Sequence, residues 1–284
     1  MMARWLMLLL VAPVSAGFVT SRPADIVPES VATKCTFDHG GIVRGPRDRK
    51  YMAMIFTGGE HGEGTESILN DLASRGIKAS FFVTGDYIRK PEHRDLLRRM
   101  IAEGHYVGPH SDAHLLYCPW DDRPRTLVAE AQFQADLEKN IADLVALGAS
   151  RERMRFFVPP YEWYNEQIVD WAGRMGLVVI SFTPGTRSNA DYLPDKHPRF
   201  IASEQIYRGI LEFEARQPDG LHGFLLLLHL GVGPERTDKM HRYVGRLADD
   251  LRGRGYRLVR VDELLGVRSP ASRPVVTTPS WQPD

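Results

Sequence analysis

The chain has 284 residues, with 36 Lys and Arg balancing 36 Asp and Glu, so no overall charge attracts it to nucleic acid or to a membrane surface. Its two cysteines exclude a disulfide scaffold and a multi-cysteine zinc module. With 43% hydrophobic and 25% charged residues it is typical of a globular protein that is long enough to bury a full core.

The two ends of the chain differ from its middle. Residues 1–16 predict a cleaved export signal, because Arg4 precedes a short apolar run and Val14-Ser15-Ala16 forms a small-residue cleavage site. No later segment is apolar for long enough to span a membrane, so we expect an exported protein, periplasmic or secreted, with no integral membrane span. In that compartment Cys35 and Cys118 could pair. Residues 17–50 are expected to wrap the domain, and the Pro/Ser/Thr-rich residues 267–284 to form a disordered tail.

Between these ends, short apolar runs alternate with segments of helical periodicity, which favours parallel strands joined by crossover helices. The predicted strands are 51–56, 79–83, 106–107, 156–158, 177–180, 224–229 and 257–261. The predicted helices are 66–75, 91–103, 127–147, 167–175, 204–217 and 237–252, followed by a turn at 262–265. An open doubly wound sheet and a closed barrel both fit this order. The glycines after the first strand lack the G-x-G-x-x-G spacing of a dinucleotide site, which disfavours the first.

Two histidines follow the third strand. His110 and His114 are spaced i and i+4, which predicts a helical turn with both imidazoles on one face. Such a pair can bind one divalent cation, although two surface histidines at a helix start would give the same pattern.

A third histidine and three carboxylates complete the candidate site. His229 ends the most apolar strand, where it can act as an acid, a base or a ligand, or simply be a satisfied core residue. Glu60 follows the first strand in a Gly-rich turn, Glu162 follows Pro159-Pro160-Tyr161, and Asp112 lies between the paired histidines. Each carboxylate alone is equally consistent with a solvated surface role.

Aromatic side chains crowd the same loops and suit the apolar faces of sugar rings, although ordinary packing is the alternative. The candidates for substrate contacts are Trp120, Tyr161, Trp163 and Tyr164. Arg236 is a further candidate for a substrate contact, unless it belongs to a helix start capped by Thr237.

Together these residues resemble the polysaccharide deacetylase family, carbohydrate esterase family 4, over residues 51–265. The matching segments are 54–59, 77–85, His110-Ser111-x-x-His114, 157–161 and 227–229. The resemblance implies an irregular parallel (β/α) barrel of the polysaccharide deacetylase type for residues 51–266. It also implies a divalent metal, usually zinc, and hydrolysis of acetamides on amino sugars.

The chain departs from the family at two motifs. The resemblance places the family's base and one metal ligand at adjacent aspartates, and this chain has Thr57 and Gly58 there. Val158 replaces the arginine that orients the base. Glu60 and Glu162 lie on the same two loops and are candidate replacements.

We therefore expect a metal-dependent hydrolase that removes acyl groups from carbohydrate by cleaving carbon–nitrogen bonds other than peptide bonds. In this reading Glu162 or Asp112 is the base and His229 protonates the leaving amine. The expected metal ligands are Glu60, His110 and His114. Two alternatives remain open: a glycoside hydrolase with Glu60 and Glu162 as its carboxylate pair, and a non-catalytic glycan-binding protein.

Overall fold

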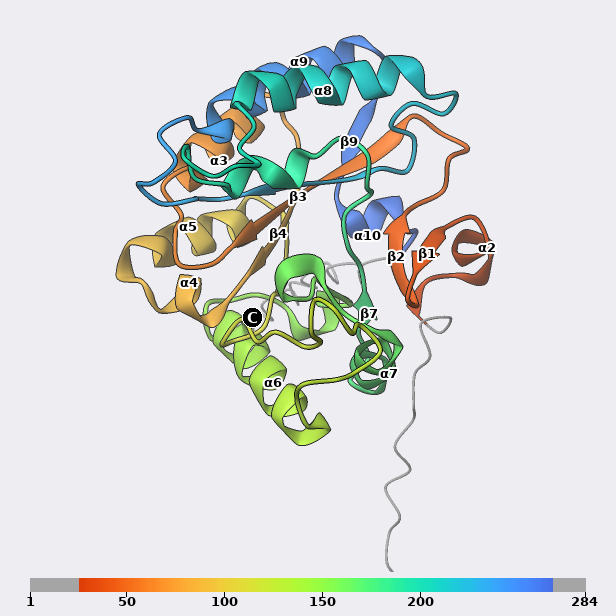
Figure 1. Ribbon diagram of the computed structural model, residues 1–284, viewed down its shortest axis with the longest axis vertical. Helices are drawn as coiled ribbons and strands as arrows, with labels where there is room; N and C mark the ends of the chain where they lie inside the picture. Colours follow the sequence, from red (N-terminus) through yellow and green to blue (C-terminus); the bar gives the residue numbers. More distant parts are fainter. Residues whose placement is uncertain (1–25, 268–284) are drawn as a thin grey trace, which may run out of the picture.

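The computed structural model describes residues 26–267 (Figure 1). The predicted export signal and the predicted tail from residue 268 onward lie outside this range. Within it, no helix has the length and apolar character needed to cross a membrane.

The central sheet is parallel and brings strands from both halves of the chain together. Its strands are β3 (Tyr51–Gly58), β4 (Ser80–Val83), β5 (Tyr106–Pro109), β8 (Leu225–His229) and β9 (Arg257–Val259). The order is β5-β4-β3-β8, and β9 pairs with the first residues of β3. A second parallel pair joins β6 (Phe156–Phe157) to β7 (Val178–Val179). An antiparallel hairpin that the sequence did not predict joins β1 (Thr36–Asp38) to β2 (Gly41–Arg44).

Three links connect these sheets into a ring. The Tyr106 hydroxyl of β5 accepts hydrogen bonds from backbone N–H groups at the start of β6. Ile42 of β2 forms a parallel bridge with Ile180 just after β7, and Arg44 forms an antiparallel bridge with Phe224 just before β8. The ring is an irregular parallel (β/α) barrel, as predicted, with β2 completing it.

Alternate residues of the strands fill the interior of the barrel. This core contains Ile42, Ala53, Ile55, Phe82, Tyr106, Phe156, Val158, Val178, Ile180, Leu225, Leu227 and Val259. Because side chains alternate between faces with a period of two, Thr57 and His229 are the next residues of β3 and β8 to point inward. They are polar and lie above the apolar core, at the carboxyl ends of their strands.

Helices cover the outside of the barrel and bury the other face of the strands (Figure 1). They are α3 (Thr65–Ser74), α4 (Gly85–Arg89), α5 (Pro91–Ala102), α6 (Glu130–Ala146), α7 (Glu166–Arg174), α8 (Ser203–Arg216) and α9 (Val244–Gly253). The short helices α2 (Glu29–Ala32) and α10 (Val261–Leu264) instead pack against the inner core. Single turns of 3₁₀ helix occur at η1 (Arg151–Arg153), η2 (Pro160–Glu162), η3 (Ser188–Tyr192) and η4 (Met240–Tyr243).

The predicted helix at 237–252 is wrong in its first part, because α9 begins at Val244. Thr237 donates hydrogen bonds to Asp195 from both its backbone and its hydroxyl, and Lys239 pairs with Glu63. These partners hold the segment before η4 as a loop. Thr237 therefore does not cap the helix.

The two cysteines are free thiols. Cys118 is buried, whereas Cys35 is half-buried and donates to the Val31 carbonyl. The pairing that the sequence allowed is therefore not formed.

Candidate active site

A cavity of about 910 Å³ opens at the carboxyl ends of the barrel strands. In a parallel barrel these ends lie at one edge, so residues far apart in the sequence meet there. The predicted site residues that line the cavity are Glu60, His110, His114, Trp120, Tyr161, Glu162 and His229.

His110 and His114 lie together, with ring centroids 5.1 Å apart, but they do not lie on a helical turn. Ser111 and His114 both adopt positive φ, which breaks any helix. The loop is instead held by Asp136 of α6, whose carboxylate accepts bonds from the Ser111 hydroxyl at 2.6 Å and from the backbone N–H groups of Asp112 and Ala113. The predicted helical geometry is therefore wrong because a side chain of α6, not a helical turn, orders this loop.

The surroundings of His110 and His114 favour the neutral form of both imidazoles. Burial, with the other histidines nearby, holds the pKa of His110 well below its ordinary value and lowers that of His114 to about 4. His110 Nδ1 lies 2.7 Å from the Val158 carbonyl oxygen, to which it donates, so Nε2 keeps a free lone pair. A neutral imidazole whose second nitrogen donates to a carbonyl is the usual state of a metal-binding histidine. The donor chemistry of this pair fits a divalent cation.

Glu60 is less closely engaged than the two histidines. Its side chain is 75% exposed and lies 4.0 Å from His61, at the mouth of the cavity. Across residues 26–267, no three His, Cys, Asp or Glu side chains are grouped so that they could hold a metal ion. The structure thus supplies two candidate ligands in place, with the Glu60 carboxylate on the same cavity wall but apart from them.

Glu162 is the carboxylate most affected by the cavity. Loss of solvent and the nearby Asp191 raise its pKa, His229 opposes this, and the resulting pKa is about 7. Both Glu162 and the preceding Tyr161 adopt positive φ in η2, which turns the chain sharply after the two prolines. A carboxyl group with a pKa near neutrality can accept a proton at physiological pH.

His229 is oriented by an aspartate that sequence reasoning missed. Asp191, in η3, accepts from His229 Nδ1 at 2.6 Å and from the His229 backbone N–H at 2.9 Å. Burial alone would lower the pKa of His229, but the buried Asp191 carboxylate outweighs this effect and raises it. The Asp191 carboxylate therefore favours the protonated form of the imidazole, and His229 lines the cavity.

Asp112 does not face the cavity. Its carboxylate accepts hydrogen bonds from Arg89 at 2.6 Å and from Lys139 at 2.7 Å. Burial raises the pKa of Asp112, but these two cations outweigh it and the net shift is downward. A permanently ionised, doubly paired carboxylate that lies outside the cavity lining is unsuited to serve as a base there.

Two of the four predicted aromatic contacts reach the cavity. Trp120 and Tyr161 are 61% and 46% exposed, with ring centroids 5.6 Å apart. Trp163 instead donates to the Pro119 carbonyl, and Tyr164 is buried with its hydroxyl donating to the Asp38 carbonyl. Tyr192, which was not predicted, also lines the cavity.

Arg236 is completely buried and forms structural contacts, not substrate contacts. Its guanidinium donates to the carbonyls of Leu193, Ile201 and Asp238 at 2.7 to 2.9 Å. These bonds tie together the two ends of the loop that follows η3.

Replacing Arg236 by Ala is expected to lower the free energy of unfolding by about 3 kcal/mol, because one buried and two half-buried carbonyls lose their donor. Denaturant unfolding measures this loss. Arg208→Ala, on the exposed face of α8 with only a helix ion pair, is the control and should cost less than about 0.5 kcal/mol. An Arg236→Ala protein of unchanged stability would contradict the structural role.

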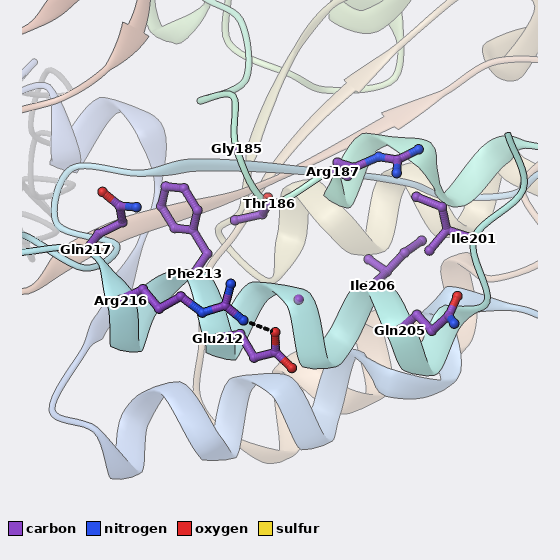
Figure 2. A pocket seen from close by; sticks show the side chains of 11 residues that line it. Gly185, Thr186, Arg187, Ile201, Gln205, Ile206, Glu212, Phe213, Arg216 and Gln217 are labelled. Carbon is purple, nitrogen blue, oxygen red and sulfur yellow. Dashed lines mark hydrogen bonds and ion pairs between the residues drawn. The ribbon is translucent and has the colours of Figure 1, made fainter.

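A second, smaller cavity of about 330 Å³ lies between α8 and the loop around Thr186 (Figure 2). Arg216 and Glu212 pair at its edge, and Phe213 contributes the apolar part. It shares no lining residue with the first cavity.

Comparison with known proteins finds similarity to one family of enzymes. Residues 44–180 match the model of the polysaccharide deacetylase family. A peptidoglycan-N-acetylglucosamine deacetylase of Bacillus cereus is 25% identical over 182 residues, covering 60% of this chain and 62% of the relative. The peptidoglycan-N-acetylglucosamine deacetylase PgdA of Listeria monocytogenes is 24% identical over 229 residues, covering 78% of this chain and 40% of PgdA. The chain thus spans about half the length of these curated relatives.

Solved structures share the fold. Bacillus subtilis PdaA, a family 4 carbohydrate esterase, superposes with a TM-score of 0.64 at 20% identity, covering 80% of this chain and 86% of PdaA. BA3943 of Bacillus anthracis, described as a family 4 pseudoenzyme, gives a TM-score of 0.62 at 18% identity, covering 81% of this chain and 70% of that one. Residues 44–180 thus match the polysaccharide deacetylase family, and the fold is that of the solved family 4 carbohydrate esterases.

Proposed function

We propose that this protein is an exported carbohydrate deacetylase that hydrolyses acetamide groups of amino sugars. The observation that carries the proposal is the pairing, in one cavity, of the Glu162 carboxyl group, whose pKa is about 7, with His229, whose Nδ1 donates to Asp191 and whose pKa that carboxylate raises. These are the properties required of a general base and a general acid at the same pH.

The reaction assigned to these residues is balanced in protons. Glu162 takes a proton from water as the water oxygen bonds to the acyl carbon. The carbon–nitrogen bond then breaks as His229 Nε2 gives its proton to the departing amine. Acetate and a free amino sugar leave, and proton exchange with solvent restores both residues. Trp120 and Tyr161 lie where they can stack on the sugar ring.

A divalent cation, zinc by the family resemblance, is part of the proposal. His110 and His114 would hold it, with Glu60 as the candidate third ligand. When bound, such a cation polarises an acyl oxygen and lowers the pKa of water.

Metal content tests this part directly. The purified protein is expected to bind about one equivalent of zinc, because the pair of neutral imidazoles suits that ion. His110→Ala and His114→Ala should lose it, whereas the control His222→Ala, which replaces a histidine outside the cavity lining, should keep it. Zinc retained by both cavity variants would contradict the assignment, and titration of Glu60→Ala decides whether the carboxylate is a ligand.

Acetate release tests the activity. N-acetylated glucosamine oligosaccharides and peptidoglycan fragments are the first substrates, because two relatives are named for that residue. Enzymatic release of acetate that His229→Ala abolishes supports the proposal. Absence of release from N-acetylated glycans by the zinc-loaded protein would refute it.

The exposed aromatic rim favours one second candidate, a glycan-binding protein without hydrolysis. The replacement of the family's two motif aspartates by Thr57 and Gly58 is consistent with it. Glycan binding by calorimetry, with no acetate released, would select this alternative.

A further inference from the structure

The hydroxyl of Thr57 has no hydrogen-bond partner although it is buried. Within residues 26–267, three buried side-chain polar atoms lack a partner: Thr57 Oγ1, Tyr117 Oη and His241 Nδ1. Of these three residues, Thr57 is the one that lines the active-site cavity. Burying a hydroxyl without a partner costs about 1–3 kcal/mol. A hydrogen-bond partner that occupies the cavity would offset this cost.

The strand register places Thr57 next to His229. Thr57 is 2% exposed and lies opposite His229 in the parallel register of β3 and β8. Paired residues on neighbouring strands lie about 4.8 Å apart and point to the same face. Both side chains therefore stand side by side above the apolar core, on the face that lines the cavity.

Thr57 and Gly59 both line the cavity. A Cβ added to Gly59 would meet no heavy atom within 4 Å, whereas one added to Gly58 would approach Leu230 and Tyr87 within 3 Å. The backbone is thus tightly packed at Gly58 and unobstructed at Gly59. Buried polar groups that lack a protein partner commonly bond to an ordered water molecule.

We infer that Thr57 Oγ1 binds the water molecule that attacks the acyl carbon, an assignment that rests on the proposed deacetylase function. The water donates one hydrogen bond to Thr57 Oγ1 and the other to the Glu162 carboxylate. Its lone pair is then directed at the substrate carbon, and its second proton goes to Glu162 in the step described above. Thr57 fixes the direction of attack without taking part in proton transfer.

Thr57→Val is the decisive variant, because valine keeps the shape and removes the hydroxyl. We expect kcat to fall by about 10- to 100-fold with little change in KM, since the water loses its orientation but the sugar contacts remain. The melting temperature should change little, because the variant loses a hydrogen bond to water but none to protein. Thr57→Ser keeps the hydroxyl and should keep kcat within about threefold of the wild type.

Thr65→Val provides the matched control. Thr65 is equally buried, but its hydroxyl bonds to the Tyr87 hydroxyl at 2.7 Å. Its valine variant should therefore melt at a lower temperature and leave kcat nearly unchanged. A fall in melting temperature for Thr65→Val, without one for Thr57→Val, would show that of these two hydroxyls the one on Thr57 lacks a protein partner.

A crystal structure separates this inference from the proposed function. An ordered water within hydrogen-bond distance of Thr57 Oγ1, missing in Thr57→Val, is expected whether or not a substrate is known. A Thr57 hydroxyl bonded to protein, or no water there, would overturn the inference even in an active enzyme. If KM rises while kcat is unchanged, the hydroxyl binds the sugar and the inference fails. A wild type that releases no acetate refutes the proposed function, and the inferred role in attack falls with it.

Discussion

Glu162→Gln is expected to lower kcat for deacetylation by about 10²- to 10⁴-fold, the usual contribution of a general base. Glutamine has the shape of glutamate but cannot take a proton from water. Substrate binding should change little, because the amide keeps the polar surface of the cavity wall. Steady-state kinetics on an acetylated oligosaccharide give both constants.

Glu162→Gln should also change how the melting temperature depends on pH. The pKa of Glu162 is about 7 in the folded protein, above its ordinary value, so the folded state binds this proton more tightly than the unfolded state. The stabilisation is complete at pH 4 and is lost as the pH rises through 7. Glutamine stays neutral, so Glu162→Gln should melt at a higher temperature than the wild type at pH 8 and near the same temperature at pH 5.

The control for both measurements is Glu92→Gln, which changes an exposed carboxylate at the start of α5. It should alter neither kcat nor the pH dependence of melting. A Glu162→Gln enzyme that keeps wild-type kcat would show that another group accepts the proton.

Asp191→Asn is expected to lower kcat by about 10²- to 10⁴-fold through its effect on His229. The Asp191 carboxylate raises the pKa of His229 and fixes the proton on Nδ1. An amide removes the charge and presents an N–H to that nitrogen. The imidazolium then loses a proton at lower pH, and the neutral ring that remains, protonated on Nε2, is too weak an acid to protonate the departing amine.

Because the pKa of His229 falls, the loss of activity should be greatest on the alkaline side of the pH profile. NMR titration of the His229 ring measures the pKa directly and distinguishes positioning from simple misfolding. Asp170→Asn, on the exposed face of α7, is the control and should move neither quantity. An unchanged His229 pKa in Asp191→Asn would contradict the assignment.

The sequence predicted the barrel strands well because most are short apolar runs bounded by turn residues. The hairpin of β1 and β2 was not predicted, because its first strand is exposed on every residue and has no apolar pattern. Its role depends on bridges to Ile180 and Phe224, which are contacts between distant segments. Local periodicity carries no information about such contacts.

The candidate site was only partly predictable for the same reason. His110, His114 and His229 could be found because each follows an apolar strand. Asp191 lies 38 residues from His229 in a loop without periodicity, so no local signal linked the two. Asp112 is a candidate base by sequence because it lies between the two histidines. Its carboxylate is instead oriented by Arg89 and Lys139, which belong to other elements.

The loops around the cavity contain backbone strain at residues whose side chains the site uses. Six non-glycine residues in the described part of the chain have positive φ, and four of them lie in these loops: Ser111, His114, Tyr161 and Glu162. Each such residue costs roughly 1 kcal/mol that glycine would avoid. At His114, Tyr161 and Glu162, glycine would relieve this backbone strain but would remove a side chain that lines the cavity. The chain therefore gives up some stability to present these three side chains to the cavity.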